Sequence, residues 1–210
     1  MGWNAAAHGV VDSRVRIFLA LRPPIEEVDR LDDFLDVRRE AGPFSWTSAE
    51  QYHLTLAFMP DVPEYRLDDL IEATRDAAAR RTAFELCLGG GGAFPDPARA
   101  KVLWVGLRQD EEAAKELDAL AAGVRGSAAH SGSDVDGQRF RPHVTLARTG
   151  RPTPMDKWIR LLDGYSGSFW TADEVEVAQS HLGEGPRGRP RHEVLAALPL
   201  GRAPGSDRGE

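Results

Sequence analysis

Hydrophobic and polar positions follow two different periods along the chain, and together they predict a mixture of strands and helices. Residues 14–21 read RVRIFLAL, an apolar run typical of a strand. Residues 23–42 begin with proline, carry acidic residues early and arginine late, and end at glycine, which is typical of a helix. Their apolar residues recur at helical spacing and predict one buried helix face: Ile25, Val28, Leu31, Phe34 and Leu35.

Further along, the same patterns predict three more helices and seven more strands. The helices are expected over residues 66–81, 110–124 and 154–163, and the strands over 44–46, 51–58, 84–90, 100–107, 140–148, 169–182 and 191–200. Strands that follow one another directly favour hairpins, so this order indicates an α+β fold with antiparallel or mixed sheets. The glycine-rich stretch 89–99 lacks the GxxxxGK[ST] pattern and is interpreted as an ordinary connection, and the polar segment 127–138 as a loop.

A five-residue motif occurs twice in the chain. HLTLA runs from His53 to Ala57, and HVTLA runs from His143 to Ala147. With six histidines and eight threonines in 210 residues, about 0.2 His-x-Thr matches are expected by chance. Each motif strand is followed by a helix and then by two strands. The repeat therefore covers a supersecondary unit and predicts two similar lobes.

The two motifs place a histidine beside a threonine on one face of a strand. Residues two apart in a strand point to the same side, so His53 projects with Thr55, and His143 projects with Thr145. The apolar residues between them are expected to point into a core: Leu54, Leu56, Val144 and Leu146. If the two lobes face each other, the cleft between them carries two histidines and two threonines.

This set of side chains suits phosphodiester hydrolysis. An in-line displacement needs a base on the attacking oxygen and an acid on the leaving oxygen, on opposite sides of phosphorus. Histidine, with a pKa of about 6.5, can supply both, one ring neutral and the other charged. Threonine hydroxyls can donate to the non-bridging oxygens, where negative charge develops. A strained cyclic phosphate is already activated, so the reaction would not require a metal ion.

Other chemistries fit these residues less well. Neither motif has a carboxylate or a cysteine at metal-ligand spacing, so no metal and no cofactor is expected. A serine hydrolase is disfavoured because the chain has no GxSxG elbow. His8 and His130 are interpreted as uninvolved. His181 and His192 flank the basic segment GEGPRGRPR, and for them a role at the rim of a substrate site stays open.

Composition narrows the class of protein. The net charge of −7 argues against a surface that binds nucleic acid over its whole extent, so any such contact should be local. Cys87 is the single cysteine, which excludes an internal disulfide and suits a reducing compartment. The first residues lack the pattern of a secretory signal, and no apolar stretch approaches the ~20 residues that span a bilayer. We therefore expect a cytoplasmic monomer without a membrane partner.

Several segments resemble the 2H phosphoesterases, a class named for two H-x-[ST]-x motifs. Within it, the chain resembles the bacterial and archaeal RNA 2′,3′-cyclic phosphodiesterases, also called 2′-5′ RNA ligase-like proteins. The matching segments follow the family's order: RIFLALRPP, HLTLAFMP, GAFPDPARAKVLWVGL, FRPHVTLAR and SHLGEGPRGRPRHEVLAALPL. The resemblance implies a single two-lobed 2H phosphoesterase domain over residues 14–200, with pseudo-twofold symmetry, a central cleft lined by the sheets and helices outside. Flexible tails are expected over residues 1–13 and 201–210.

The resemblance also implies an activity, the hydrolysis of RNA 2′,3′-cyclic phosphate ends to 2′-phosphate ends. Carried over to this chain, His53 resembles the general acid and His143 the general base, while Thr55 and Thr145 resemble the residues that hold the phosphate. The partners would be RNA ends or small cyclic nucleotide phosphates. Three alternatives stay open: 2′-5′ RNA ligation by the same site, hydrolysis of another cyclic nucleotide phosphate, and non-catalytic binding of RNA ends.

Two details depart from a simple match. The family's second motif often continues to an arginine that binds substrate, matched here by Arg148, but in a regular strand Arg148 faces away from the motif's histidine and threonine. It reaches the cleft only if the strand ends or bulges, and the turn-like residues 149–152 favour an end near Ala147. The first motif continues to Met59-Pro60 where the family commonly has Leu-Gly, so the loop after that strand is expected to differ.

Overall fold

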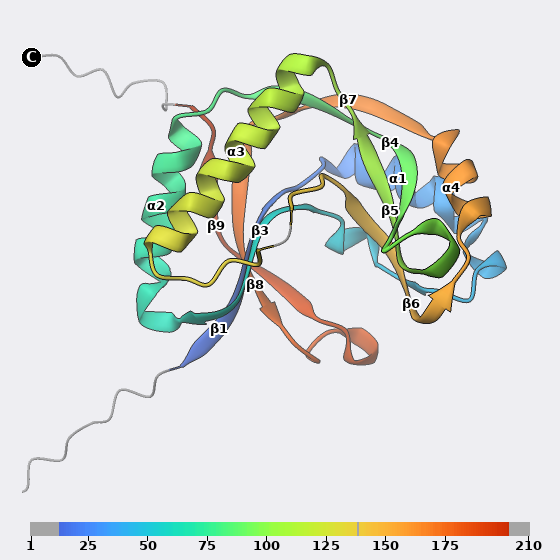
Figure 1. Ribbon diagram of the computed structural model, residues 1–210, viewed down its shortest axis with the longest axis horizontal. Coiled ribbons are helices and arrows are strands. Elements are labelled where there is room, and N and C mark those ends of the chain that lie inside the picture. The colour runs from blue at the N-terminus through green and yellow to red at the C-terminus, as the bar shows by residue number, and fades with distance from the viewer. Residues whose placement is uncertain (1–12, 138, 202–210) are drawn as a thin grey trace, which may run out of the picture.

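The computed structural model describes residues 13–201 except residue 138, so the predicted tails lie outside the described residues apart from positions 13 and 201. Strands and helices occur together, as the α+β prediction requires (Figure 1). The helices are α1 Ile25–Asp36, α2 Leu67–Ala79, α3 Glu111–His130 and α4 Asp156–Asp163. The strands are β1 Arg14–Leu21, β2 Ser45–Trp46, β3 Leu54–Pro63, β4 Phe84–Phe94, β5 Ala100–Arg108, β6 Val144–Thr153, β7 Ser166–Ala172, β8 Glu174–His181 and β9 Arg191–Pro199.

The described strands form one curled sheet in two halves. Its order is β7-β4-β5-β6-β3-β1-β8-β9, with β2 attached to β6, and every pairing is antiparallel. The halves join where β3 meets β6, through the single pair Leu54 and Val144. The first half holds β3, β1, β8 and β9, and the second half holds β7, β4, β5 and β6. The predicted two-lobed α+β architecture is confirmed, and of the two sheet types it allowed the described strands show the antiparallel one.

Two helices are exchanged between the halves. Helix α1 directly follows β1 of the first half in sequence, yet it packs on the second half, where Glu27 accepts a hydrogen bond from the backbone N–H of Ser168 at 2.8 Å. Helix α3 lies in sequence between two strands of the second half, yet it packs beside α2 against β3. Figure 1 shows α2 and α3 on one side of the molecule and α1 and α4 on the other. The two halves are thereby tied into one body.

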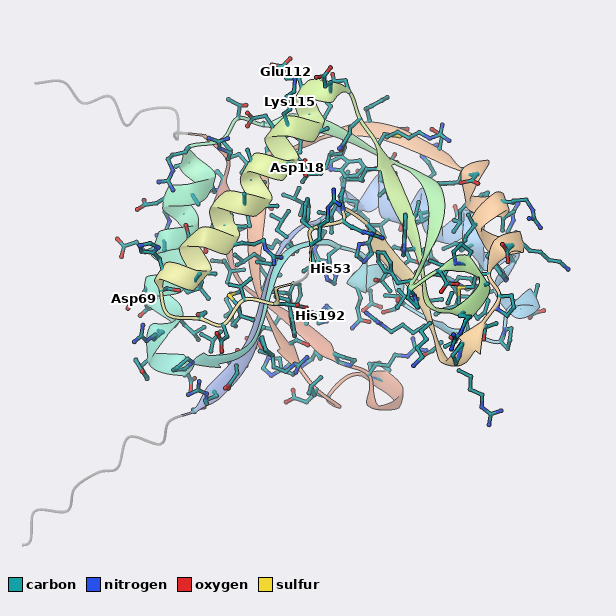
Figure 2. All side chains as sticks on the ribbon, in the orientation of Figure 1. His53, Asp69, Glu112, Lys115, Asp118 and His192 are labelled. Atoms are coloured by element: carbon teal, nitrogen blue, oxygen red, sulfur yellow. The ribbon has the colours of Figure 1, made fainter. Side chains whose placement is uncertain are left out.

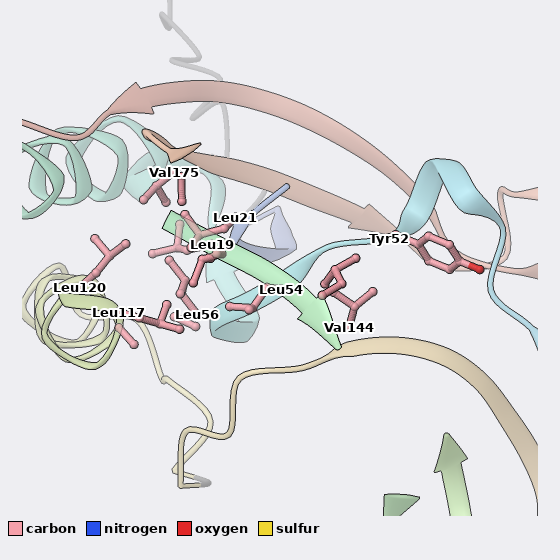
Figure 3. Close-up of a cluster of buried hydrophobic side chains, with 14 of the residues drawn as sticks. Leu19, Leu21, Tyr52, Leu54, Leu56, Leu117, Leu120, Val144 and Val175 are labelled. Carbon is pink, nitrogen blue, oxygen red and sulfur yellow. The ribbon is translucent and has the colours of Figure 1, made fainter. Parts of the chain in front are cut away.

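The apolar positions of both motifs lie in the core. Leu54 and Leu56 are at most 2 % exposed, and Val144 and Leu146 are fully buried, so the prediction that these residues face inward is confirmed. Figure 3 shows side chains of α3 meeting Leu56 and residues of β1. Burial of such side chains stabilises by roughly 1.5–3 kcal/mol each. This rigid support holds the neighbouring polar side chains in place.

Several boundaries differ from those predicted. Helix α3 runs to His130, through part of the predicted polar loop, because Ala128 is fully buried against the core. The predicted strand 169–182 is two strands, which are separated at Asp173. Both motif strands continue past the expected ends, β3 to Pro63 and β6 to Thr153. No helix among the described residues has the length and apolar character needed to cross a membrane.

The glycine run was predicted to be a simple connection. The structure shows instead that it is part of β4. At Gly92 an added Cβ would lie 1.9 Å from the Trp104 ring, and at Gly91 it would lie 2.7 Å from the Ile159 carbonyl oxygen. Only glycine therefore lets β4 pack this closely against Trp104 on one side and α4 on the other. This close approach places Phe94, the last residue of β4, at the cleft described next.

Candidate active site

A cavity of about 1110 Å³ lies between the two halves of the sheet. It contains all five residues that were proposed from the sequence as site residues: His53, Thr55, His143, Thr145 and Arg148. Figure 2 shows His53 near the middle of the molecule, with His192 beside it. The other lining residues used below are Arg16, Phe18, Phe58, Phe94, Lys101, Val102, Asp136, Arg139, Arg141, Ser180, Arg189 and His192.

The two motif histidines flank the junction of the halves. Both histidines were predicted to lie within a strand. In the structure His53 is the residue before β3, and His143 is the residue before β6. The residues that follow them, Leu54 and Val144, form the pair that joins β3 to β6. Each histidine is thus one residue from the local axis that relates the halves. This arrangement brings the two rings to one cleft.

Both histidine rings are held in the same way. Nδ1 of His53 lies 2.7 Å from the carbonyl oxygen of Gln51, and Nδ1 of His143 lies 2.6 Å from that of Arg141. A carbonyl oxygen only accepts, so each Nδ1 carries the proton and donates it. In the neutral rings Nε2 is then the nitrogen with a free lone pair. Each ring can accept a proton at Nε2, or donate one there when charged.

A β-bulge follows each histidine. The bulge in β6 explains how Arg148 comes to face the same side as Thr145. Between β5 and β6, Trp104 pairs with Thr145 and Val102 pairs with Arg148, so three steps on β6 oppose two on β5. Thr145 and Arg148 therefore share the face of Trp104 and Val102, and Arg148 lines the cavity. The predicted end of the strand near Ala147 is wrong, because the strand bulges there instead.

The first half contains the same bulge. Ala20 pairs with Thr55 and Phe18 pairs with Phe58, so Phe58 occupies the position in β3 that Arg148 occupies in β6. Two adjacent residues of each motif, Leu56-Ala57 and Leu146-Ala147, are buried at the bulges. The two halves are therefore alike in backbone but differ in side chains, since one presents a phenyl ring and the other a guanidinium group.

Aromatic side chains surround the two histidines. The ring of Phe18 stacks on His53 with centroids 4.7 Å apart. On the other side, Phe94 meets His143 edge-on at 4.9 Å, and Trp104 lies 5.9 Å from it. Trp104 is half-buried, and its ring also contacts that of Phe94 at 5.3 Å. These rings exclude water from the back of each histidine.

The cavity is cationic although the chain is acidic. Asp136 is the one carboxylate among the described lining residues, against six cationic side chains: Arg16, Lys101, Arg139, Arg141, Arg148 and Arg189. Arg189 is fixed across the cleft, where it donates a hydrogen bond to the backbone carbonyl of Trp46. A local concentration of positive charge within a protein of net charge −7 suits a phosphate-containing ligand.

Burial makes both motif histidines weak bases. It lowers the pKa of His53 to about 4, and the charges of His192 and His143 when protonated, and of Arg22, act in the same direction. It also lowers the pKa of His143, with a further contribution from Arg148. In both residues the hydrogen bond to the backbone carbonyl opposes the shift. Both rings are therefore neutral in the ligand-free protein near pH 7.

No group of three or more histidine, cysteine, aspartate or glutamate side chains in the described part of the chain is placed to hold a metal ion. The lone Cys87 is buried away from the cleft lining. The histidine nitrogens at Nδ1 are occupied by carbonyl oxygens, which leaves one nitrogen per ring for chemistry. The cleft therefore offers acid–base groups and hydrogen-bond donors.

Sequence reasoning left the role of His192 open and did not identify Phe94, and both line the cleft. His192 enters from β9, where it pairs with Ser180 of β8. Its ring lies 5.3 Å from that of His53. The segment GEGPRGRPR marked this hairpin, but no sequence pattern showed that it folds back toward the first motif. His181, on the same hairpin, lies outside the cavity and contacts Glu193 at 3.0 Å.

A curled antiparallel sheet that presents two His-x-Thr pairs to one cleft defines the 2H phosphoesterase class. Solved structures share this fold: LigT of E. coli in its apo form has a TM-score of 0.67 and 26% identity, covering 90% of this chain and 99% of that one. TT0787 of Thermus thermophilus has a TM-score of 0.69 and 26% identity, covering 90% and 100%. The chain belongs to the 2′-5′ RNA ligase superfamily, whose family model matches residues 22–184.

Curated relatives include proteins named RNA 2′,3′-cyclic phosphodiesterase. An RNA 2′,3′-cyclic phosphodiesterase of Geobacillus stearothermophilus is 31% identical over 200 residues, covering 94% of this chain and 61% of that protein. One of Aeropyrum pernix is 33% identical over 176 residues, covering 81% of this chain and 97% of that protein. The chain therefore spans less than two thirds of the first relative and nearly all of the second.

Proposed function

We propose that this protein hydrolyses RNA 2′,3′-cyclic phosphate ends to 2′-phosphate ends. The observation that carries the proposal is the pair of equivalent His-x-Thr sites that open into one cationic cleft. The names of the curated relatives support the same reaction. A structure of E. coli LigT complexed with 3′-AMP supports a nucleotide as the group that enters such a cleft.

The proposed mechanism is an in-line displacement. His143 accepts a proton at Nε2 from a water molecule whose oxygen attacks phosphorus. The bond from phosphorus to the 3′ oxygen breaks, and His53 donates its Nε2 proton to that oxygen. The products are a 3′ hydroxyl and a 2′-phosphate, with one proton gained by His143 and one lost by His53. The assignment of acid and base follows the family resemblance, since both rings have the same backbone hydrogen bond.

The other polar residues would hold the phosphate. Thr55 and Thr145 line the cavity beside the histidines and can donate hydroxyl hydrogens to the non-bridging oxygens. Arg148 can add two parallel N–H donors to the same oxygens. Stabilising the charge that develops there requires donors already in position, and the buried motif residues provide that support.

One incubation tests the proposal. The protein is mixed with a short RNA that ends in a 2′,3′-cyclic phosphate, and the position of the product phosphate is read by ³¹P NMR. A 2′-phosphate is expected. Adding an RNA with a 5′ hydroxyl tests ligation, which would yield a 2′-5′ linkage. Binding of the RNA without any change in its phosphate would contradict the proposal and favour a non-catalytic RNA-end-binding protein.

We expect turnover to survive removal of metal ions. The proposed steps use side-chain protons and hydrogen bonds, and neither motif has a carboxylate or a cysteine at ligand spacing. The measurement is the initial rate after dialysis against excess EDTA, with a magnesium-dependent phosphodiesterase as the matched control. Loss of the rate, with recovery on adding a divalent ion, would contradict metal-independent hydrolysis.

The pH dependence of kcat/KM is expected to be bell-shaped, with its maximum below pH ~6.5, because burial lowers the pKa of both histidines from that ordinary value. The acid limb reports the base, which must lose its proton, and the alkaline limb reports the acid, which must keep one. A bound phosphate raises the pKa of the nearby rings. The alkaline limb of kcat should therefore lie at higher pH than that of kcat/KM, and a rate that only rises with pH would contradict the two-histidine mechanism.

A further inference from the structure

His192 is a third histidine of the cleft, contributed by an element far from either motif. It lies at the start of β9, and its ring meets Phe18 edge-on at 4.8 Å and His53 at 5.3 Å, with an interplanar angle of 81° to the latter. The three rings form a cluster on the first half of the sheet, and Figure 2 shows His192 next to His53. The position beside His143 is instead occupied by Phe94 and Trp104. Among the residues that the structure describes, only the His53 side therefore has an additional titratable ring.

The two nitrogens of His192 have different surroundings. Nδ1 is buried and has no hydrogen-bond partner. The residue as a whole is half-buried and lines the cavity. Among buried backbone groups, orphaned N–H donors are rarer than orphaned carbonyl acceptors, and we apply the same preference to the ring nitrogens. The favoured neutral form of His192 therefore has its lone pair on the buried Nδ1 and its proton on Nε2.

This tautomer is the opposite of that of the motif histidines. His53 donates from Nδ1 to the carbonyl of Gln51, so its neutral ring has a lone pair at Nε2. The neutral ring of His192 instead has an N–H donor at Nε2. Burial and the charge of Arg22 lower the pKa of His192, which keeps this ring neutral near pH 7. Other charged groups on this side of the cleft are Arg16 on β1 and Arg189 before β9.

We propose that His192 contacts the substrate, donating its Nε2–H to an oxygen of the terminal nucleotide on the His53 side of the cleft. The inference rests on the proposed function, in which His53 faces the departing 3′ oxygen and therefore the terminal ribose. A neutral donor there binds an oxygen without adding a second positive charge beside His53. Such a charge would lower the pKa of His53 further and weaken it as a proton carrier at neutral pH.

Two substitutions at this position separate binding from packing. His192→Phe keeps the ring that packs on Phe18 and removes the donor, whereas His192→Gln loses the ring and keeps an N–H donor at similar reach. If His192 binds substrate, we expect kcat/KM and the affinity for a short RNA ending in a 2′-phosphate to fall about 10- to 100-fold in the Phe variant, the usual effect of losing a hydrogen bond to a charged group. The Gln variant should stay within about threefold, since its donor remains.

Matched controls come from the same hairpin. His181 lies on β8, contacts Glu193 and is not among the residues that line the cavity. His181→Phe and His181→Gln should both leave kcat/KM and product affinity unchanged. If His192 only packs, the order at position 192 reverses, with the Phe variant equal to or better than the Gln variant. That order would overturn the inference.

Product binding keeps the test independent of turnover. If the unsubstituted protein binds the 2′-phosphate RNA but hydrolyses no cyclic phosphate, the proposed function fails while the comparison of the two variants still decides the role of His192. If it binds neither RNA, the inference fails as well. Long-range ¹H–¹⁵N NMR of the histidine rings adds a second readout, with the proton of His192 expected on Nε2 and that of His53 on Nδ1. A proton of His192 on Nδ1 would contradict the donor role.

Discussion

Replacing either motif histidine by alanine is expected to lower kcat by about 10²–10⁴-fold, the range typical of losing a general acid or base. His53 and His143 each present one free nitrogen to the cleft, so neither can take over the other's proton transfer. Because both histidines must act within one displacement, the kcat of the double variant should be only slightly lower than that of the less active single variant. The measurement is kcat with an RNA that ends in a 2′,3′-cyclic phosphate.

The matched control is His130→Ala, at the exposed end of α3 outside the cleft. It should leave kcat unchanged. The melting temperatures of all variants should lie close together, because the residues that hold the motifs in the core are the intervening apolar ones such as Leu54 and Val144. Near-normal kcat in either His53→Ala or His143→Ala would end the two-histidine mechanism.

Removing the guanidinium group of Arg148 is expected to lower kcat/KM by about 10²–10³-fold, comparable with the loss of one oxyanion donor elsewhere. The bulge in β6 turns this side chain to the face of Thr145, where it lines the cavity. A guanidinium can hold phosphate oxygens with two parallel hydrogen bonds, which an ammonium cannot reproduce. We therefore expect Arg148→Lys to remain well below the unsubstituted protein and Arg148→Ala to be lower still.

Arg151 provides the comparison for this arginine. It lies three residues later in the same strand, is exposed, and is not among the cavity-lining residues, so Arg151→Ala should keep its activity. Circular dichroism and melting temperature establish that each variant is folded. If Arg148→Lys and Arg148→Ala both keep near-normal kcat/KM, Arg148 belongs to the solvated surface and not to the phosphate site.

Local patterns in the sequence predicted the class of fold and the residues that meet in the cleft. The alternation around His53 and His143 identified which residues point inward, because a strand has a period of two whatever its partner. The bulges could not be predicted from the sequence, because a bulge is a property of the register between two strands. The sequence of β6 alone does not show that Thr145 pairs with Trp104. The end expected near Ala147 failed for this reason, because the strand partner β5 continues beside residues 148–153.

The features that the sequence left open or did not reveal also depend on residues far apart along the chain. The role of Gly92 depends on a tryptophan that approaches from the neighbouring strand, which local composition does not reveal. His192 reaches the cleft because β9 pairs with β8, which in turn pairs with β1 beside His53. Three successive strand pairings, β9 with β8, β8 with β1 and β1 with β3, connect it to the motif strand. A single-sequence pattern records none of them.

The exchange of α1 and α3 between the halves also limits how the cleft can move. Each half owes part of its hydrophobic cover to a helix that is covalently attached to strands of the other. A hinge that spread the halves would have to pull α1 from β7 or α3 from β3, exposing apolar surface at both places. Opening by rotation of the halves is therefore disfavoured, and any ligand enters a mouth that is already formed. The spacing of the two histidines is set when the chain folds, before any ligand arrives.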